Sequence, residues 1–218
     1  MKSAILFGAT GLIGSNLLNL LIKNDDYSKI TIFTRREISN TNQKLEIHKI
    51  DFSKIEDYST LISGNDCFYC IGTTKKQTPN KMSYINTEYE LPIKIAKLAK
   101  ENNVESFIYV SSGGANAQSK NLYLQNKGRA ENEIVKLSFS FTAIIQPSLL
   151  LGDRNEVRIG ESIAQFIFKN LSFLFIGKLR PFKAIKANNV AKAIVIIIEN
   201  KYKDLYFTSE KLEDFAKI

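Results

Sequence analysis

The chain has few of the side chains that build metal sites, because its 218 residues contain one histidine, two cysteines and no tryptophan. No group of His, Cys, Asp and Glu shows the spacing of metal ligands, so we expect no bound metal. The single histidine, His48, falls within an expected strand at residues 44–50. A structural role is far commoner for such a histidine than catalysis or metal binding.

The two cysteines, Cys67 and Cys70, have the spacing C-x-x-C. A redox pair with this spacing lies at a helix N-terminus, where the thiolate is stabilised. Here the pair falls in an expected strand at residues 66–71, in which residues three apart face opposite sides of the sheet. We therefore expect two buried core cysteines and no redox site.

Long apolar runs are also lacking. The runs at residues 143–151 and 193–198 are broken by Gln146 and Pro147 or are too short to span a bilayer. The first expected strand starts at residue 3, which leaves no room for a signal peptide ahead of it. These absences predict a cytoplasmic protein with no membrane partner.

The charge balance is basic, since 30 Lys and Arg against 22 Asp and Glu give a formal net charge of +8. Such a chain can bind nucleic acid, a membrane surface or an anionic small molecule. The lysines are scattered and no groove-reading motif accompanies them, so we expect a solvated basic surface and no nucleic-acid partner. A hydrophobic content of 44% and a length of 218 residues suit one domain over residues 1–218.

Strand and helix patterns alternate along the chain. The expected strands are residues 3–7, 29–34, 44–50, 66–71, 104–110, 139–145 and a short one at 205–208. The expected helices are residues 11–23, 54–62, 81–101 (kinked or divided by Pro92), 122–137, 156–169 and 188–199. In the helix at 81–101, helical spacing predicts an apolar face of Ile85, Tyr89, Ile93, Ala96 and Leu98. This alternation predicts an α/β fold, a three-layer doubly wound parallel sheet of strand order 3-2-1-4-5-6 with a short seventh strand. Ligands of such sheets bind beyond the carboxyl ends of the strands.

The first expected strand runs into a glycine-rich loop, GATGLIG, which opens a helix. The first glycine permits a tight turn, the second lets the backbone approach a ligand, and the third lets helix and strand pack closely. The helix N-terminus offers free N–H groups and a positive dipole end to a pyrophosphate. The residues expected to bind a dinucleotide here are Gly8, Thr10, Gly11, Leu12, Ile13 and Gly14.

Three further strand ends carry candidate cofactor ligands. After the second strand, Arg35 and Arg36 stand where an NAD site has an acid, so they favour the 2′-phosphate of NADP(H) over NAD(H), although they could also be surface arginines. After the third strand, Asp51 can accept from the adenine amino group or cap the next helix, with Phe52 beside the ring. After the fourth strand, the candidates are Gly72, Thr73 and Thr74.

A candidate catalytic set follows the fifth strand. Tyr123 and Lys127 lie four residues apart, on one face of the expected helix 122–137, eleven residues after Ser112. A lysine cation favours the phenolate form of the tyrosine, which can then exchange a proton with a carbonyl or alcohol oxygen. Ser112 can bond the substrate oxygen. Lys127 can also hold the nicotinamide ribose, so Tyr123 and Lys127 are cofactor-binding candidates as well as catalytic ones. A surface Tyr–Lys pair is the alternative, because this spacing also arises by chance.

With these residues in place, the chain resembles the atypical short-chain dehydrogenases/reductases, and among them the Tat-interactive-protein-like oxidoreductases. The glycine spacing G-x-x-G-x-x-G is typical of short-chain dehydrogenases. The resemblance is carried by the segments GATGLIGSNLL, FTRR, YCIGTT, VSSGGANAQSKNLYLQNKGRAE and QPSLLLGDRNEVRIGE.

The resemblance implies a Rossmann core, NADP(H) at the glycine loop and the arginines, and a Ser–Tyr–Lys active site. It also implies that Pro147 and Ser148 approach the nicotinamide, although many members have Pro-Gly there. Asn86 is the candidate for the structural asparagine of the family. Residues 152–187 would form a small substrate-side region, in which Arg154 and Arg158 attract an anionic substrate or a partner, or form surface ion pairs.

The sequence therefore predicts an NADP(H)-dependent oxidoreductase that acts on a small carbonyl or alcohol substrate. The alternative is a non-catalytic NADP(H)-binding regulator that senses redox state and acts through a protein partner. Sugar epimerases and dehydratases resemble the family as well, but the short C-terminal part leaves little room for their larger substrate domain. A homodimer is a further expectation for the assembly.

Overall fold

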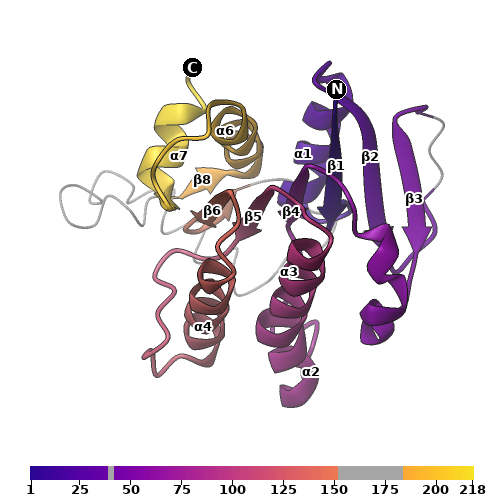
Figure 1. Ribbon diagram of the computed structural model, residues 1–218. Helices are drawn as coiled ribbons and strands as arrows, with labels where there is room; N and C mark the ends of the chain where they lie inside the picture. The colour runs from indigo at the N-terminus through magenta and orange to yellow at the C-terminus, as the bar shows by residue number, and fades with distance from the viewer. Residues whose placement is uncertain (39–41, 152–183) are drawn as a thin grey trace.

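The computed structural model describes residues 1–38, 42–151 and 184–218 (Figure 1). The predicted helix at residues 156–169, most of the predicted substrate-side region, Arg154 and Arg158 lie outside the described residues. Within the described residues, no helix combines the length and the hydrophobicity needed to cross a bilayer.

A seven-stranded parallel sheet forms the centre of the molecule, in the order β3-β2-β1-β4-β5-β6-β9. The strands are β1 (Lys2–Phe7), β2 (Tyr27–Thr34), β3 (Leu45–Lys49), β4 (Asp66–Tyr69), β5 (Ser106–Val110), β6 (Phe141–Gln146) and β9 (Tyr206–Thr208). The predicted order and the short seventh strand are confirmed. Two further short strands, β7 (Leu150–Leu151) and β8 (Ile185–Lys186), pair with each other and were not predicted.

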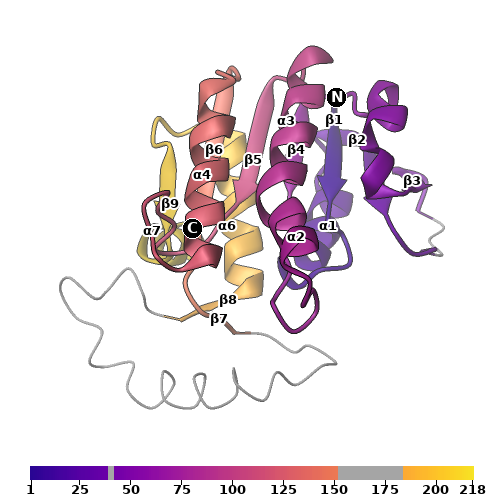
Figure 2. The ribbon, with the colours of Figure 1, turned by 90° about the horizontal axis from the view of Figure 1, so that it is seen from below.

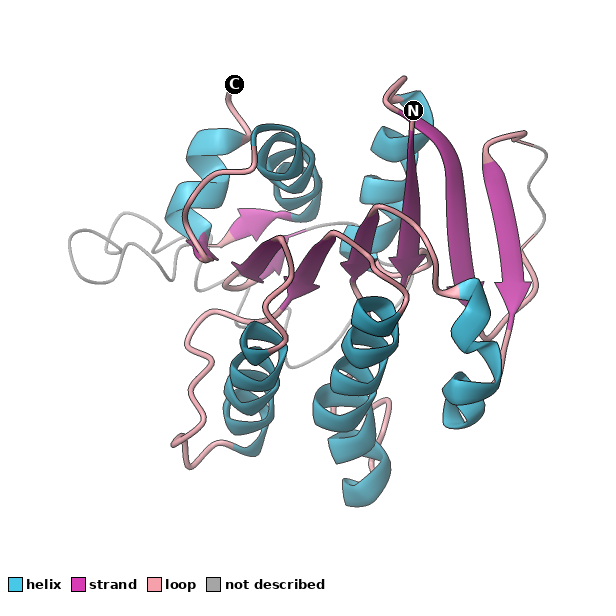
Figure 3. Cartoon of the chain, viewed as in Figure 1, coloured by secondary structure: helices cyan, strands magenta, loops and turns pink. Residues whose placement is uncertain are grey.

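Helices cover both faces of this sheet (Figures 1 and 3). One layer holds α1 (Leu12–Lys23), α6 (Ala187–Asn200) and α7 (Ser209–Phe215), the last of which was not predicted. The other holds the 3-10 helix η1 (Phe52–Leu61), α2 (Lys81–Ile85), the π-helical turn η2 (Asn86–Glu90), α3 (Leu91–Glu101) and α4 (Leu122–Lys136), seen in front of the sheet in Figure 2. The three-layer architecture is confirmed.

The core is divided by the sheet into two apolar clusters, because successive side chains of a strand point to opposite faces. In β1, Ala4 and Leu6 pack in the cluster under α1 and α6, whereas Ile5 and Phe7 pack in the cluster under α3. All four are fully buried. A strand covered on both faces must be apolar throughout, which explains the continuous run that opens the chain.

The helix predicted at residues 81–101 is divided, and its buried face differs from the predicted one. The predicted apolar positions were Ile85, Tyr89, Ile93, Ala96 and Leu98. Ala96 is buried as predicted, but the other buried side chains are Tyr84, Glu88, Leu91, Pro92, Ile95 and Ala99, whereas Tyr89, Ile93 and Leu98 are only partly buried. In η2 the N–H of Leu91 reaches back five residues to the carbonyl of Asn86, so the helix is divided before Pro92.

The cysteines and the histidine have structural surroundings. Cys67 is fully buried, Cys70 is half-buried just beyond β4, and both are free thiols. Burial raises the pKa of both thiols, for Cys70 to about 12, so neither is a reactive thiolate near pH 7. His48 stacks on Phe33 with ring centroids 5.5 Å apart, and among the described residues no cluster could hold a metal ion.

Candidate functional site

The glycine loop between β1 and α1 is tightly packed against its own backbone. Gly8 has a φ of +88°, and a Cβ built on it would lie 2.7 Å from the carbonyl carbon of Cys70. A Cβ on Gly14 would lie 2.0 Å from the Gly8 oxygen. The loop therefore requires glycine at both positions, and it brings the first turn of α1 against the end of β1.

The first turn of α1 fits a pyrophosphate. Gly11 is the N-cap, no side chain bonds the cap, and no acidic residue lies in the first turn. The amides of Leu12, Ile13 and Gly14 are the N-terminal donors that have no partner within a helix. Free amides, a positive dipole end and an approach free of side chains form a cradle for phosphate, so these residues fit a bound dinucleotide.

The two arginines lie beside this loop, because β2 is the neighbour of β1 in the sheet. The hydroxyl of Thr34 accepts from the Arg36 amide at 3.2 Å and donates to the Arg36 carbonyl at 2.9 Å. This turn fixes the backbone at the end of β2, while the side chains of Arg35 and Arg36 are exposed. Two guanidinium groups are therefore free to approach an anion beside the glycine loop.

Asp51 takes the capping role that the sequence left open. Its carboxylate accepts from the amide and the hydroxyl of Ser53 at 2.9 and 2.8 Å, at the start of η1. These hydrogen bonds lower the pKa of the Asp51 carboxyl. Phe52 packs on Phe7 with ring centroids 6.3 Å apart. A carboxylate has further lone pairs, so an additional contact with adenine remains a prediction.

The loop after β4 is held by its own hydrogen bonds. The hydroxyls of Thr73 and Thr78 are 2.8 Å apart, and the hydroxyl of Thr74 accepts from the Gln77 amide at 3.3 Å. The amide of Thr73 donates to the carboxylate of Glu88 in η2. Contacts of Gly72, Thr73 and Thr74 with a cofactor remain predictions, but their backbone lies at the carboxyl edge as expected.

Lys127, on α4, is buried beside the carboxyl end of β5. Its side chain is 3% exposed, and its ammonium donates to the carbonyl of Val110, the last residue of β5, at 3.2 Å. The Lys127 Nζ also lies 3.1 Å from Glu88 Oε2 and 4.9 Å from the centre of the Tyr109 ring. Burial disfavours the charged amine, but the Glu88 carboxylate beside it holds the Lys127 pKa well above its usual value.

Tyr123 and Ser112 are the other two members of the predicted catalytic set. Tyr123 is half-buried on α4, one turn before Lys127, and interacts electrostatically with its ammonium. Ser112 is half-buried two residues beyond Val110, and its hydroxyl makes one long bond, 3.4 Å, to the Gly113 carbonyl. The preceding serine, Ser111, is buried and donates to Glu131, so it is not available to a substrate.

Comparison with known proteins agrees with this geometry. A family model described as NAD(P)H-binding matches residues 8–201. The chain belongs to this NAD(P)H-binding family of atypical short-chain dehydrogenases/reductases (SDRs). It is 35% identical over 196 residues to "Protein FMP52, mitochondrial" of Candida albicans, covering 87% of this chain and 86% of the relative.

Two further proteins extend the comparison, one by sequence and one by fold. This chain is 33% identical over 178 residues to "Protein HTATIP2" of Rattus norvegicus, covering 78% of this chain and 72% of that protein. Its fold is similar to UDP-glucose 4-epimerase of Thermotoga maritima, with a TM-score of 0.69 and 15% identity over 99% of this chain and 81% of the epimerase. The second likeness concerns the fold alone.

The segment after β6 is tied to the C-terminal part of this SDR. The Gly113 amide donates to the Pro147 carbonyl at 2.7 Å, which joins the segment to the end of β5. The Ser148 amide donates to the hydroxyl of Ser209 at 2.7 Å, and that hydroxyl donates to Ser148 Oγ at 2.8 Å. Ser209, the first residue of α7, is thus a supporting residue that the sequence did not reveal.

Glu88 is the more consequential residue that the sequence did not reveal. We expected Asn86 to be the structural polar residue of this helix, but Asn86 is only half-buried and Glu88 contacts Lys127. The signal was present in the sequence, since a buried helix face that carries a carboxylate needs a buried cation as its partner. The charge of Glu88 hid this face, because the carboxylate interrupts the otherwise apolar helical spacing of Tyr84, Leu91 and Ile95.

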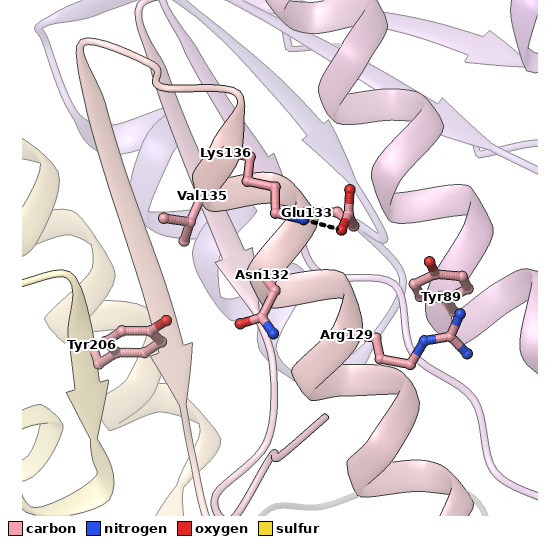
Figure 4. Close-up of a pocket in the computed structure, with 7 residues that line it drawn as sticks. All are labelled: Tyr89, Arg129, Asn132, Glu133, Val135, Lys136 and Tyr206. Carbon is pink, nitrogen blue, oxygen red and sulfur yellow. Dashed lines mark hydrogen bonds and ion pairs between the residues drawn. The ribbon is translucent and has the colours of Figure 1, made fainter. Parts of the chain in front are cut away.

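A surface pocket of about 280 Å³ lies apart from the strand ends that carry the predicted cofactor ligands (Figure 4). Its lining residues are Tyr89, Arg129, Asn132, Glu133, Val135, Lys136 and Tyr206. Arg129 lies over the Tyr89 ring at 4.0 Å, and Glu133 and Lys136 pair at 2.7 Å. None of the predicted site residues lines it, so this surface belongs to the outer side of α4 and not to the dinucleotide site.

Proposed function

We propose that this SDR is an NADP(H)-dependent oxidoreductase that reduces a small carbonyl compound. The observation that carries the proposal is the burial of Lys127, a cation on α4 that donates to the Val110 carbonyl at the end of β5 and pairs with Glu88. A surface Tyr–Lys pair would have an exposed lysine. Here the lysine is 3% exposed and held by hydrogen bonds toward the sheet.

Each residue then has a defined task. The first-turn amides of α1 would bind the pyrophosphate, and Arg35 and Arg36 the 2′-phosphate. When bound, the cofactor would supply the hydride. Ser112 would donate a hydrogen bond to the carbonyl oxygen, and Tyr123 would give that oxygen its proton. Lys127 would favour the phenolate that remains and also hold the nicotinamide ribose.

The preference for NADP(H) is tested by thermal stabilisation. At the same concentration we expect NADPH to raise the melting temperature of the wild type well above the effect of NADH, because stabilisation by a ligand grows with the logarithm of its concentration divided by its Kd. The double variant Arg35→Ala/Arg36→Ala should lose roughly ten- to hundredfold in NADPH affinity, since a charge-assisted hydrogen bond is worth about 1.5–3 kcal/mol. Its response to NADH should not change.

Arg129→Ala is the matched control for this experiment, since Arg129 is an exposed arginine on α4 away from the glycine loop. It should keep the NADPH preference of the wild type. Equal melting shifts with NADPH and NADH in the wild type would remove the arginines from their proposed role.

Turnover is tested with a panel of small ketones, aldehydes and enones, following NADPH oxidation at 340 nm. Reduction of at least one compound supports the enzyme. If NADPH binds and no compound is reduced, the non-catalytic NADP(H)-binding regulator becomes the better proposal. Binding partners in that case would be sought with NADP⁺- and NADPH-loaded protein, since a redox sensor must bind its partner differently in the two states.

We further propose a cytoplasmic location and no nucleic-acid or membrane partner, as the composition indicates. The Candida albicans relative is named as mitochondrial, which defines the alternative. Subcellular fractionation with compartment markers separates the two locations. Sedimentation velocity would establish whether the protein is a homodimer.

A further inference from the structure

Lys127 has an unusual setting for a residue that must remain a cation. An ammonium group removed from water loses several kcal/mol of hydration, and without compensation it gives up its proton. A neutral amine would neither favour the phenolate form of Tyr123 nor donate all three hydrogen bonds of an ammonium. The burial of Lys127 therefore requires a partner that supplies negative charge inside the molecule.

Glu88 supplies that charge. It is fully buried, and its Oε2 lies 3.1 Å from Lys127 Nζ. Its other oxygen, Oε1, accepts from the amide of Thr73 in the loop after β4. A single carboxylate thus contacts both the lysine of α4 and the loop that carries Gly72, Thr73 and Thr74.

Glu88 lies within the π-helical turn η2. In η2 the Leu91 amide donates to the carbonyl of Asn86, five residues back, and Pro92 follows without an N–H of its own. π-Helical turns of this kind are frequent at functional sites. Glu88 is on the same buried face as Tyr84 before the turn and Leu91 after it, so this face of the helix is apolar except for one carboxylate.

We propose, on the basis of the proposed carbonyl reduction, that Glu88 is a positioning residue that keeps Lys127 a cation beside Tyr123 and fastens the Gly72–Thr74 loop to the same carboxylate. Glu88 acts through Lys127 and through the Thr73 amide. It has no contact with solvent, so it does not itself exchange protons with substrate.

The other ionisable groups around Lys127 leave this task to Glu88. They are Tyr69 from β4, Cys70 just beyond it, Tyr84 from α2, Tyr109 from β5, and Tyr123 and Glu131 from α4. Burial raises the pKa of Tyr69, Cys70, Tyr84 and Tyr109, so these groups are neutral near pH 7. Glu131 is occupied by hydrogen bonds from Ser111 and Gln146, the latter at 3.0 Å.

The pH profile of carbonyl reduction separates this role from simple packing. In Glu88→Gln the ammonium loses its counter-ion, so the pKa of Lys127 falls, and any remaining cation favours the Tyr123 phenolate more strongly. Reduction needs Tyr123 as a protonated phenol beside a charged Lys127, and both changes make this form rarer at high pH. The pH at which kcat/KM begins to fall on the alkaline side should therefore be lower than in the wild type by about one pH unit or more.

Two variants complete that experiment. Glu88→Asp keeps the charge and should keep the limb within about half a unit of the wild type, whatever its kcat. Glu90→Gln changes an exposed carboxylate in the same turn and should leave the profile unchanged. If Glu88→Gln lowers activity equally at every pH, the residue is only structural and the inference is wrong.

A second measurement needs no substrate or cofactor. In protein labelled with ¹³C at lysine Cε, the Lys127 signal is identified by its absence in Lys127→Arg. In the wild type it should stay in the ammonium form to higher pH than exposed lysines, and in Glu88→Gln it should titrate below them. Coincident titrations in the two proteins overturn the inference. A shifted titration with no turnover of any carbonyl upholds the role of Glu88 and removes the proposed reaction instead.

Discussion

Replacing Tyr123 with Phe is expected to lower carbonyl reduction by roughly 10²- to 10⁴-fold while NADPH binding is retained, because a positioned general acid contributes about that factor. The phenol is half-buried on the helix turn that also carries Lys127. Removing one oxygen deletes the proton donor and leaves the ring in place. The measurement is kcat/KM for a reduced substrate, with NADPH affinity determined separately by fluorescence.

The matched control is Tyr89→Phe. Tyr89 lies in η2 against Arg129 on the outer side of α4, so the same chemical change there should leave turnover near the wild-type value. Retained turnover in Tyr123→Phe would exclude this tyrosine as the proton donor. Loss of NADPH binding in the variant would also contradict the prediction, since the ring that stands beside the cofactor is kept and only the proton-donating oxygen is removed.

Replacing Gly14 with Ala is the second large effect. The added methyl group would lie 2.0 Å from the Gly8 oxygen, a backbone atom that cannot rotate away. Helix α1 must then move off β1, which costs about 3 kcal/mol or more, because overpacking a rigid site forces backbone shifts. For a protein of this length the melting temperature should fall by roughly 6–12 °C, and stabilisation by NADPH should disappear.

Gly72→Ala is the control for that substitution. The nearest atom to a Cβ at Gly72 is Glu88 Oε1 at 3.8 Å, an ordinary contact, so its melting temperature should lie close to that of the wild type. Calorimetry of the three proteins without NADPH provides this comparison, and NADPH is then added to the wild type and Gly14→Ala alone, because Gly72 is itself a predicted cofactor contact. A Gly14→Ala protein that melts with the wild type would show that the loop can relax more than this packing allows.

Much of the architecture followed from local sequence patterns. The alternation of short apolar strands and helical segments predicted the parallel sheet and its order, which the structure confirms. The two apolar clusters on either face of the sheet explain why the strands could be recognised. Ala4 packs in one cluster and Ile5 in the other, so a central strand must be apolar on both faces. The predicted helix over residues 122–137 also placed Tyr123 and Lys127 correctly on α4.

Local patterns were weaker where one helix offered two possible buried faces. The apolar spacing after Lys81 indicated Ile85 and Tyr89 as the inward positions, but Tyr84 and Glu88, one residue earlier in each case, are the buried ones. The buried face has equally regular spacing, but a carboxylate within it makes that face read as polar in the sequence. The short strands β7 and β8 were missed because two residues are too few to show a strand pattern.

The sequence alone determined the glycine loop, the two arginines beside it and the candidate set of Ser112, Tyr123 and Lys127, because neighbouring residues and helical spacing specify them. Only the tertiary structure decided which groups hold that set. Ser148 and Ser209 are 61 residues apart, and Glu88 meets Lys127 from a different helix. Such pairs arise from burial, since a polar group removed from water must find its partner wherever the folded chain places one.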